Sequence, residues 1–333
     1  IRSFFRQRGR EMPERNKVQA MFPVGSTPIE NTCGTAPGIR ARLHAARVFV
    51  MPGVPREMQV MFERDVLPYL RAEATGRVIL TETVWTFGQG ESMVAARIAD
   101  LMERGRNPTV GTTAHDAIIG VRIVATGASR PEARDMLDAT VAELRRRLGT
   151  LIYGQGDQTL SHAVGELLVR RGQTVATAES CTGGMIAQTL TDVPGSSRYF
   201  VGGYVCYANQ SKTDWLGVPA TLITRFGAVS PAVAEAMGRA GRDRSGADWA
   251  IAVTGIAGPE GGTPDKPVGL VYIALAGPDG CRVREYRLGE FLSRSDIRSR
   301  TRWIALNLLR LALLGEHAGD GWAVQPSAPS PCP

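Results

Sequence analysis

Lysine is rare in this chain, and its few positions mark candidate sites for proton transfer. Only three of the 39 basic residues are lysines, Lys17, Lys212 and Lys266, and the others are arginines. An arginine side chain stays protonated in a protein, whereas a lysine removed from water can lose its proton and act as a base. Lys212 lies five residues after Tyr207, just beyond the apolar run VGGYVCYA, which predicts a strand. Lys212 is therefore a candidate general base, with a solvated side chain as the alternative.

A glycine-rich turn offers a matching nucleophile. The sequence SCTGG at 180–184 follows the apolar run 173–179 and opens a segment with helical spacing. Such a turn presents backbone N–H groups and the positive end of a helix, which suit a phosphate or a developing oxyanion. Ser180 is the candidate nucleophile, and a tight connection without a ligand is the alternative. The candidate substrate contacts in this turn are Thr182, Gly183 and Gly184.

The expected sheet would bring these positions to one edge. Ligands of open α/β sheets collect at the carboxyl ends of the strands, and both Ser180 and Lys212 follow a predicted strand. A deprotonated lysine can take the proton of a serine hydroxyl, and Tyr207 can relay or orient that proton. A third predicted strand ends in Thr254 and Gly255, which are candidates to bind a polar group of the substrate.

Cysteine and histidine give weaker signals. Cys181 is a rival nucleophile because a thiol at a helix N-terminus can have a lowered pKa, and a small buried core residue is the alternative. Cys206 points to the opposite side of its predicted strand from Tyr207 and is expected in the core. The five cysteines form no C-x-x-C pair, and the four histidines are isolated from one another. We therefore expect reduced thiols and no metal site.

The chemistry-bearing residues fall in the last of several expected domains. A chain of 333 residues is long enough for two or three domains. Strands and helices alternate over 157–316, which predicts a three-layer α/β domain. Before it, 75–156 predicts a small α+β module similar to a KH fold, although it lacks the G-x-x-G loop with which KH folds hold RNA. Residues 1–74 predict helix, loop, strand, loop and helix, with a strand over 47–55 and a helix over 56–70.

Composition limits the function classes. The chain has no apolar stretch long enough for a membrane span and no secretory signal, so we expect a cytoplasmic protein without a membrane partner. The net charge of +7 comes mainly from the first 150 residues and is too modest to predict nucleic-acid binding by itself. The proline-rich segment 317–333 is expected to be a disordered tail. The start at Ile1 suggests that the natural N-terminus is missing.

Several ordered segments make the last domain similar to the C-terminal domain of the CinA family, the competence/damage-inducible proteins. The matching segments are TAESCTGGMIAQTLTDVPGSSRYFVGGYVCYANQSK, GAVSPAVAEAM, VTGIAGPEGG, KPVGLVYIAL and FLSRSDIRSR. The resemblance implies a nicotinamide mononucleotide deamidase of pyridine nucleotide salvage, which hydrolyses the carboxamide to the acid and releases ammonia without a cofactor.

The same resemblance assigns roles residue by residue. Ser180 matches the nucleophile, Tyr207 and Lys212 match the residues that activate it, and Thr254 and Arg294 match substrate-site residues. The substrate phosphate would meet Arg294 or the glycine turn. Lys266 also matches the family and is either a substrate contact or a solvated side chain. The family usually has serine where this chain has Ala208, a change that leaves both proposed bases in place.

The front of the chain resembles the other half of these proteins. The segments PVGSTPIENTCGTAPG and MPGVPREM match the later part of a molybdopterin-binding-like domain, which in some members is a metal-dependent ADP-ribose pyrophosphatase. The earlier part, with its glycine-rich phosphate loop and aspartates, is absent from this sequence. We therefore expect no pyrophosphatase turnover here, and residual nucleotide binding stays an alternative. Residues 75–156 match the connecting domain of the family.

A second class of function competes with the enzyme. A nucleic-acid-associated protein acting in DNA uptake or damage would use the basic first half and would be indifferent to Ser180. The chemistry-bearing residues favour the enzyme. The long apolar helix expected over 297–314 is either a homodimer contact or part of the core.

Overall fold

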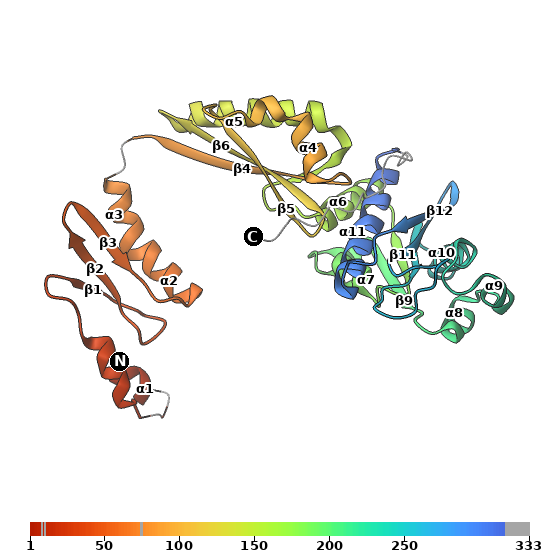
Figure 1. Ribbon diagram of the computed structural model, residues 1–333, viewed down its shortest axis with the longest axis horizontal. Helices are drawn as coiled ribbons and strands as arrows, with labels where there is room; N and C mark the ends of the chain where they lie inside the picture. The colour runs from red at the N-terminus through yellow and green to blue at the C-terminus, as the bar shows by residue number, and fades with distance from the viewer. Residues whose placement is uncertain (8, 10, 74–75, 317–333) are drawn as a thin grey trace. The chain divides into compact units, whose positions relative to one another are not determined.

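The computed structural model describes residues 1–7, 9, 11–73 and 76–316, and the expected tail at 317–333 lies outside them (Figure 1). The chain forms two compact units, Ile1–Arg77 and Val78–Pro333. Within the described part of the chain, no helix combines the length and the apolar character needed to cross a bilayer.

The first unit is a small antiparallel sheet covered by a helical segment. Its elements are α1 (Arg2–Arg6), η1 (Glu14–Ala20), β1 (Thr27–Ile29), β2 (Gly38–Leu43), β3 (Ala46–Val50), α2 (Pro55–Met61), η2 (Phe62–Val66) and α3 (Leu67–Ala72). The core consists of Ile29, Met61 and Val66, with Phe49 packed against it. The sequence prediction found β3 and the long helical segment but missed β1 and β2, because three to six residues with little alternation give no strand signal.

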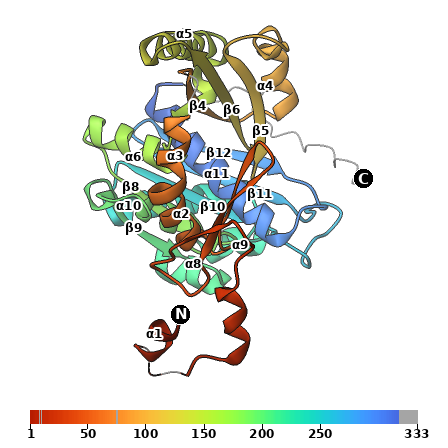
Figure 2. The ribbon, with the colours of Figure 1, turned by 90° about the vertical axis from the view of Figure 1, so that its left-hand side faces the viewer.

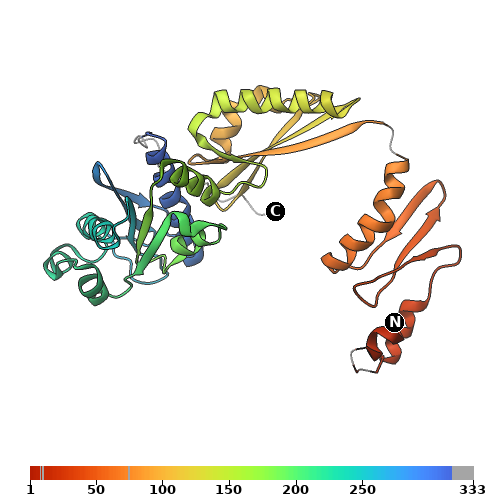
Figure 3. The same cartoon turned by 180° about the vertical axis from the view of Figure 1, so that it is seen from behind.

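The second unit begins with a four-stranded antiparallel sheet, which we call the connecting module. Its elements are β4 (Val78–Phe87), α4 (Glu91–Arg97), η3 (Ala99–Met102), β5 (Thr109–His115), β6 (Ile118–Gly127), α5 (Arg130–Leu148), η4 (Gly149–Leu151) and β7 (Ile152–Gln155). The strand order is β5-β6-β4-β7, and α5 lies along one face of the sheet (Figures 1 and 3). Val84 and Ile123 on the sheet pack with Leu137 and Leu144 on α5.

The remainder of the second unit, which we call the C-terminal domain, has a five-stranded sheet in the order β12-β11-β10-β8-β9. Its strands are β8 (Val175–Glu179), β9 (Phe200–Val205), β10 (Trp249–Gly255), β11 (Leu270–Gly277) and β12 (Gly280–Arg287). Its helices are α6 (Leu160–Arg171), α7 (Met185–Thr191), η5 (Ser196–Arg198), α8 (Asn209–Leu216), α9 (Ala220–Phe226), α10 (Pro231–Ser245) and α11 (Arg294–Leu313). Strands β8, β9 and β10 are parallel, so their carboxyl ends share one edge.

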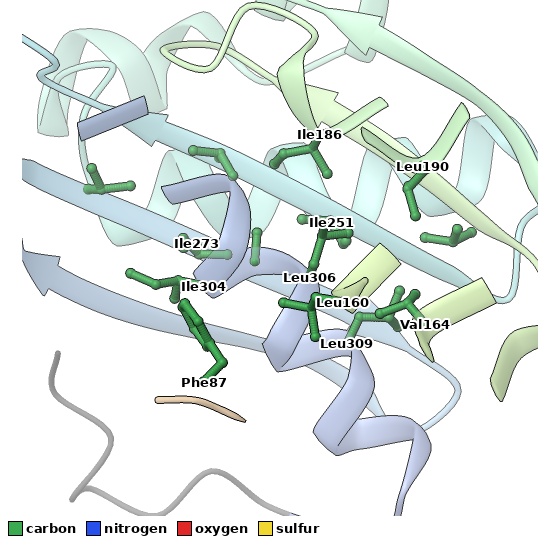
Figure 4. Packing of buried hydrophobic residues seen from close by; sticks show 14 of the residues in the cluster. Phe87, Leu160, Val164, Ile186, Leu190, Ile251, Ile273, Ile304, Leu306 and Leu309 are labelled. Carbon is green, nitrogen blue, oxygen red and sulfur yellow. The ribbon is translucent and has the colours of Figure 1, made fainter. Parts of the chain in front are cut away.

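Helices cover both faces of this sheet, which gives three layers and confirms the predicted α/β class. On one face, Leu160 and Val164 of α6, Ile186 of α7 and Ile304 of α11 pack around Ile251 of β10 (Figure 4). In Figure 2 the blue helix α11 runs beside the strands of this sheet. Its apolar residues are buried in this core, which is one of the two roles expected for this helix.

Helix α10 covers the opposite face at close range. A Cβ atom at Gly238 would lie 3.2 Å from the Cβ of Ala274, and one at Gly241 would lie 3.3 Å from the Cβ of Ala178. Both distances are tighter than ordinary van der Waals contact, so the two glycines set how closely the helix approaches the strands. Val233 and Met237 fill the remaining space on this face.

A buried arginine joins the connecting module to α11. Arg310 is 2% exposed and donates hydrogen bonds to the carbonyl oxygens of Thr150 (2.5 Å) and Ile152 (3.2 Å) and to Asn307 Oδ1 (2.9 Å). Burial lowers the pKa of Arg310 to about 10. The predicted boundary between 156 and 157 stays a prediction, since both sides belong to one compact unit.

We expect Arg310→Met to destabilise the second unit, because it leaves the carbonyl groups of Thr150 and Ile152 without their donor. The free energy of unfolding should fall by about 2 kcal/mol, the usual cost of unpaired buried polar groups. Urea unfolding followed by tryptophan fluorescence measures this change. The control Arg170→Met removes an exposed arginine 3.8 Å from Glu166 and should stay within about 0.5 kcal/mol of the wild type. Equal stability of both variants would contradict the assigned role of Arg310.

Candidate active site

A serine and a lysine meet at the carboxyl edge of the parallel strands. Ser180 directly follows β8, and Lys212 lies in α8, which begins shortly after β9. Lys212 Nζ lies 3.0 Å from Ser180 Oγ, 2.9 Å from the carbonyl oxygen of Cys206 and 3.1 Å from that of Tyr207. Ser180 is 8% exposed and Lys212 only 1%. The structure therefore brings the two residues together as the sequence analysis expected.

The surroundings of Lys212 favour its neutral form. Burial lowers the pKa of Lys212 below its ordinary value of 10.5, because an ammonium group loses its hydration there. Its three partners are neutral oxygen atoms, which do not compensate the charge as a carboxylate would. A neutral amine has two N–H donors and one lone pair. In the protonated form Nζ donates to all three oxygen atoms, and in the neutral form two N–H groups donate to the carbonyl groups while the lone pair can accept the hydroxyl proton of Ser180.

The turn from Ser180 to Gly184, the nucleophile turn, is fixed by hydrogen bonds from inside the domain. The N–H of Ser180 donates to Val253 O on β10 (3.0 Å), and the N–H of Gly183 donates to Ser180 O (3.0 Å). Gly183 and Gly184 have φ values of +62° and +91°, which other residues adopt only with strain. The two glycines are therefore needed for the backbone conformation of the turn.

A buried carboxylate occupies the helix end that was expected to bind substrate. Glu179, fully buried at the end of β8, accepts hydrogen bonds from the N–H groups of Gly184 (3.0 Å), Ile186 (3.1 Å) and Ala187 (2.8 Å). The expectation that the positive end of α7 is free for a substrate anion is wrong, because Glu179 already neutralises it. Gly184 in particular has no N–H left to offer.

Two amide groups of the turn do remain. Among the described residues, no hydrogen-bond acceptor is found for the N–H groups of Cys181 and Thr182, nor a partner for the buried hydroxyl of Thr182. Both residues are buried, at 5% and 0% exposed. Buried donors without partners cost free energy, so these groups are candidates to be satisfied by a bound substrate.

Tyr207 and Arg294 form a second, more exposed pair. Arg294, the first residue of α11, donates from Nη2 to the phenol oxygen of Tyr207 (2.7 Å) and from Nη1 to Gly258 O (2.7 Å). The Tyr207 side chain is exposed, whereas its main-chain carbonyl is the group that contacts Lys212. The phenol is thus paired with Arg294, and the Lys212 amine reaches Ser180 directly.

Thr254 and Gly255 lie at the same edge of the sheet, but both make contacts within the protein. The buried hydroxyl of Thr254 donates to Ala228 O (2.8 Å). A Cβ atom at Gly255 would lie 2.8 Å from Val271 Cγ2, so this glycine permits close packing of β10 and β11. Thr254 can still accept a hydrogen bond from substrate through its oxygen, but its proton is already in use.

Lys266 holds a loop. Its Nζ donates to Phe226 O (2.7 Å) and Val229 O (2.8 Å), between α9 and α10. It is therefore not a fully solvated side chain, and its hydrogen bonds flank Ala228, the partner of Thr254, while its contact with substrate stays a prediction.

The thiols of the domain are poor nucleophiles. Burial raises the pKa of Cys181 to about 12, so its reactive thiolate form is scarce at neutral pH. Cys206 is fully buried and packs in the core with Leu216 and Val218, as expected. Among the described residues, His, Cys, Asp and Glu side chains do not gather in groups of three or more that could hold a metal ion.

Sequence reasoning missed Glu179 and Arg298. Arg298 Nη2 donates to Thr182 O (2.8 Å) from α11, 116 residues further along the chain. Glu179 could have been found, because a carboxylate that ends a wholly buried strand just before a helix is a candidate for capping that helix. Arg298 gave no local signal, since only the tertiary fold brings α11 to the turn.

We expect Glu179→Gln to loosen the nucleophile turn, because an amide has one acceptor oxygen where the carboxylate has two. At least one N–H of Gly184, Ile186 or Ala187 would lose its partner, and the free energy of unfolding should fall by about 2 kcal/mol. Denaturant unfolding measures the loss. The control Glu290→Gln makes the same change at an exposed position and should stay within about 0.5 kcal/mol of the wild type. A stable Glu179→Gln variant would refute this account of the turn.

Comparison with known proteins places these residues in a family context. Residues 157–313 match the model of the CinA C-terminal domain, and residues 81–154 match that of the damage-inducible protein CinA KH domain. A CinA-like protein of Parasynechococcus marenigrum is 45% identical over 311 residues, which cover 92% of this chain and 74% of that protein. A CinA-like protein of Geobacter sulfurreducens is 43% identical over 317 residues, which cover 94% and 76%.

Two further matches cover a smaller share of one of the two aligned proteins. A relative from Symbiobacterium thermophilum is 47% identical over 277 residues, and the chain spans only 65% of its length. Among solved structures, the crystal structure of the competence/damage inducible protein CihA from Agrobacterium tumefaciens is 44% identical, with a TM-score of 0.45. The match covers 46% of this chain and 93% of that one.

Proposed function

The chain belongs to the CinA family, and we propose that its C-terminal domain is an amidohydrolase that converts nicotinamide mononucleotide to nicotinate mononucleotide and ammonia. The proposal rests above all on the buried contact between Ser180 and Lys212. A serine hydroxyl attacks a carboxamide only when a base removes its proton, and Lys212, whose pKa burial lowers, acts as that base once it has lost its own proton. The substrate itself is the one that the family resemblance implies.

The reaction proceeds through an ester of Ser180. Ser180 Oγ forms a bond to the carboxamide carbon while its proton passes to Lys212 Nζ. The carbonyl oxygen becomes an oxyanion, for which the unpaired N–H groups of Cys181 and Thr182 are the donors. The carbon–nitrogen bond then breaks, Lys212 returns the proton to the nitrogen, and ammonia leaves.

Water completes the cycle. A water molecule attacks the ester carbon and gives a proton to Lys212, and Ser180 recovers its hydroxyl proton as the acid departs. The sum is one carboxamide and one water giving one carboxylic acid and one ammonia, without a cofactor. The direct contact between the two side chains favours proton transfer without Tyr207 as a relay.

Arg294 remains the candidate for the substrate phosphate. It is exposed, and its bonds to Gly258 and Tyr207 use two of the five N–H donors of a guanidinium group. A guanidinium group binds phosphate through paired N–H donors. The glycine turn is the weaker candidate, because Glu179 accepts hydrogen bonds from the backbone at the N-terminus of α7.

Removing either member of the pair should abolish ammonia release from nicotinamide mononucleotide. We expect Ser180→Ala and Lys212→Met each to lower kcat by at least about 10³-fold, because nucleophile and base act as one unit. A coupled assay for ammonia measures the rates. The control Cys181→Ala, at the adjacent residue, should keep most of the activity. Wild-type rates in both Ser180→Ala and Lys212→Met would refute the proposal, and loss of activity only in Cys181→Ala would identify the thiol as nucleophile.

The rate should rise with pH as Lys212 loses its proton. Because burial lowers the pKa of Lys212, the amine becomes neutral at a lower pH than a free lysine, and only the neutral form can accept the serine proton. We therefore expect kcat/KM to increase with pH and to reach a plateau below the ordinary lysine value of 10.5. A pH profile of ammonia release measures this. A rate that falls as pH rises through this range would contradict Lys212 as the base.

A further inference from the structure

Arg298 on helix α11 donates a hydrogen bond to the nucleophile turn. It lies half-buried on α11, and its Nη2 donates to the carbonyl oxygen of Thr182 (2.8 Å). A Cβ atom at Gly183 would lie 3.4 Å from the same Nη2, so the guanidinium group packs directly against the turn. The charge of Arg298 also acts on the neighbouring Cys181 thiol, whose pKa it lowers against the larger effect of burial.

This contact fixes a peptide plane. The carbonyl of Thr182 and the N–H of Gly183 belong to one planar peptide group and point in opposite directions. Arg298 donates the shorter of two hydrogen bonds to the carbonyl, at 2.8 Å against 3.3 Å from the N–H of Met185, while the Gly183 N–H donates to Ser180 O at 3.0 Å. Hydrogen bonds on opposite sides of one rigid group leave it little freedom to rotate.

The turn is therefore clamped from two directions. Glu179 binds the N–H groups that follow Gly183, and Arg298 binds the carbonyl that precedes it. The N–H groups of Ser180, Gly183 and Met185 donate to main-chain carbonyls, so among the described residues of the turn those of Cys181 and Thr182 are left without an acceptor. These are the groups that the proposed mechanism assigns to the oxyanion. Their directions are set by the peptide planes around them, and Arg298 fixes the plane next to Thr182.

Hydrogen bonds on both sides of Arg298 hold helix α11 in place. Its first turn is closed by a capping box between Ser293 and Asp296. One residue past Arg298, Ser299 donates to Asp116 of the connecting module (2.5 Å), and Trp303 Nε1 donates to the same carboxylate (2.8 Å). A side chain whose support is fixed on both sides can position a neighbouring group to within a fraction of an ångström.

We propose that Arg298 is a positioning residue, which orients the oxyanion-binding N–H groups of Cys181 and Thr182 by holding the Thr182 carbonyl. This inference rests on the proposed function. Arg298 acts through the backbone of the turn and binds no substrate group. Misplacement of oxyanion donors weakens transition-state binding more than ground-state binding, so the effect falls on kcat rather than on KM.

The first experiment compares three variants in ammonia release from nicotinamide mononucleotide. Arg298→Met should lower kcat by about 10- to 100-fold, less than the complete loss of an oxyanion donor, and should leave KM within about 3-fold. Arg298→Lys keeps a charged donor for the single bond to Thr182 and should recover most of the rate. The control Arg300→Met, on the same helix, should behave like the wild type. The pH profile should keep its midpoint in all three, because Lys212 is untouched.

A second readout does not depend on the substrate. Phenylmethanesulfonyl fluoride reacts with an activated serine by forming a sulfur–oxygen bond to Oγ and releasing fluoride, and mass spectrometry measures the rate of Ser180 labelling. We expect slower labelling in Arg298→Met, wild-type labelling in Arg300→Met and none in Ser180→Ala. If the wild type labels at Ser180 but releases no ammonia, and Arg298→Met still slows labelling, the proposed substrate is wrong and the positioning role stands.

Other outcomes overturn the inference. An unchanged kcat and labelling rate in Arg298→Met would show that the turn holds its shape without the arginine. A raised KM with an unchanged kcat would make Arg298 a substrate contact. If Arg298→Met fails to fold, Arg298→Lys carries the test, and a folded lysine variant with neither activity nor labelling would also refute the inference. If the wild type neither releases ammonia nor is labelled at Ser180, Ser180 is not an activated nucleophile. This result would refute both the proposed function and the role of Arg298.

Discussion

The site depends on the burial of one lysine without a negatively charged partner. An ammonium group in this position would lose most of its hydration, and three neutral oxygen atoms recover only part of that loss. The free energy of folding must therefore offset the cost of burying Lys212. Two main-chain carbonyls that follow β9, those of Cys206 and Tyr207, accept hydrogen bonds from Lys212. The low proton affinity that results is what makes an ordinary serine a candidate nucleophile.

A second buried charge shapes the turn beside it. Glu179 ends β8 inside the domain and satisfies the first N–H groups of α7. The positive end of a helix usually attracts an external anion, but here the chain supplies the anion itself. Among the described residues, the N–H groups of Cys181 and Thr182 stay without an acceptor, and the oppositely charged Arg298 contacts the turn at the carbonyl of Thr182. Burial, helix polarity and a single arginine thus decide which backbone groups are left to bind a ligand.

Helix α11 links this edge to the rest of the second unit. Near its start it carries Arg294 and Arg298 to the site, and near its end Arg310 reaches the main chain between α5 and β7. Asp116, at the tip of the β5–β6 hairpin, holds the middle of the same helix. The connecting module and the candidate site therefore share one rigid element, which gives the module a structural part in placing the site.

Local sequence was enough to predict most of the elements and the meeting of Ser180 with Lys212. Apolar runs ending in Ser180 and near Lys212, together with the scarcity of lysine, were enough to predict an α/β domain with both residues at one edge, because parallel strands align their carboxyl ends. The family and the α/β class were confirmed, and the roles of the site residues stay predictions. The short strands β1 and β2 were not predicted, because pairing with a neighbouring strand, and not a periodic sequence pattern, makes them strands. Only the tertiary structure decided that Thr254 donates to Ala228 and that Arg298 contacts the turn, because each contact joins residues distant in the chain.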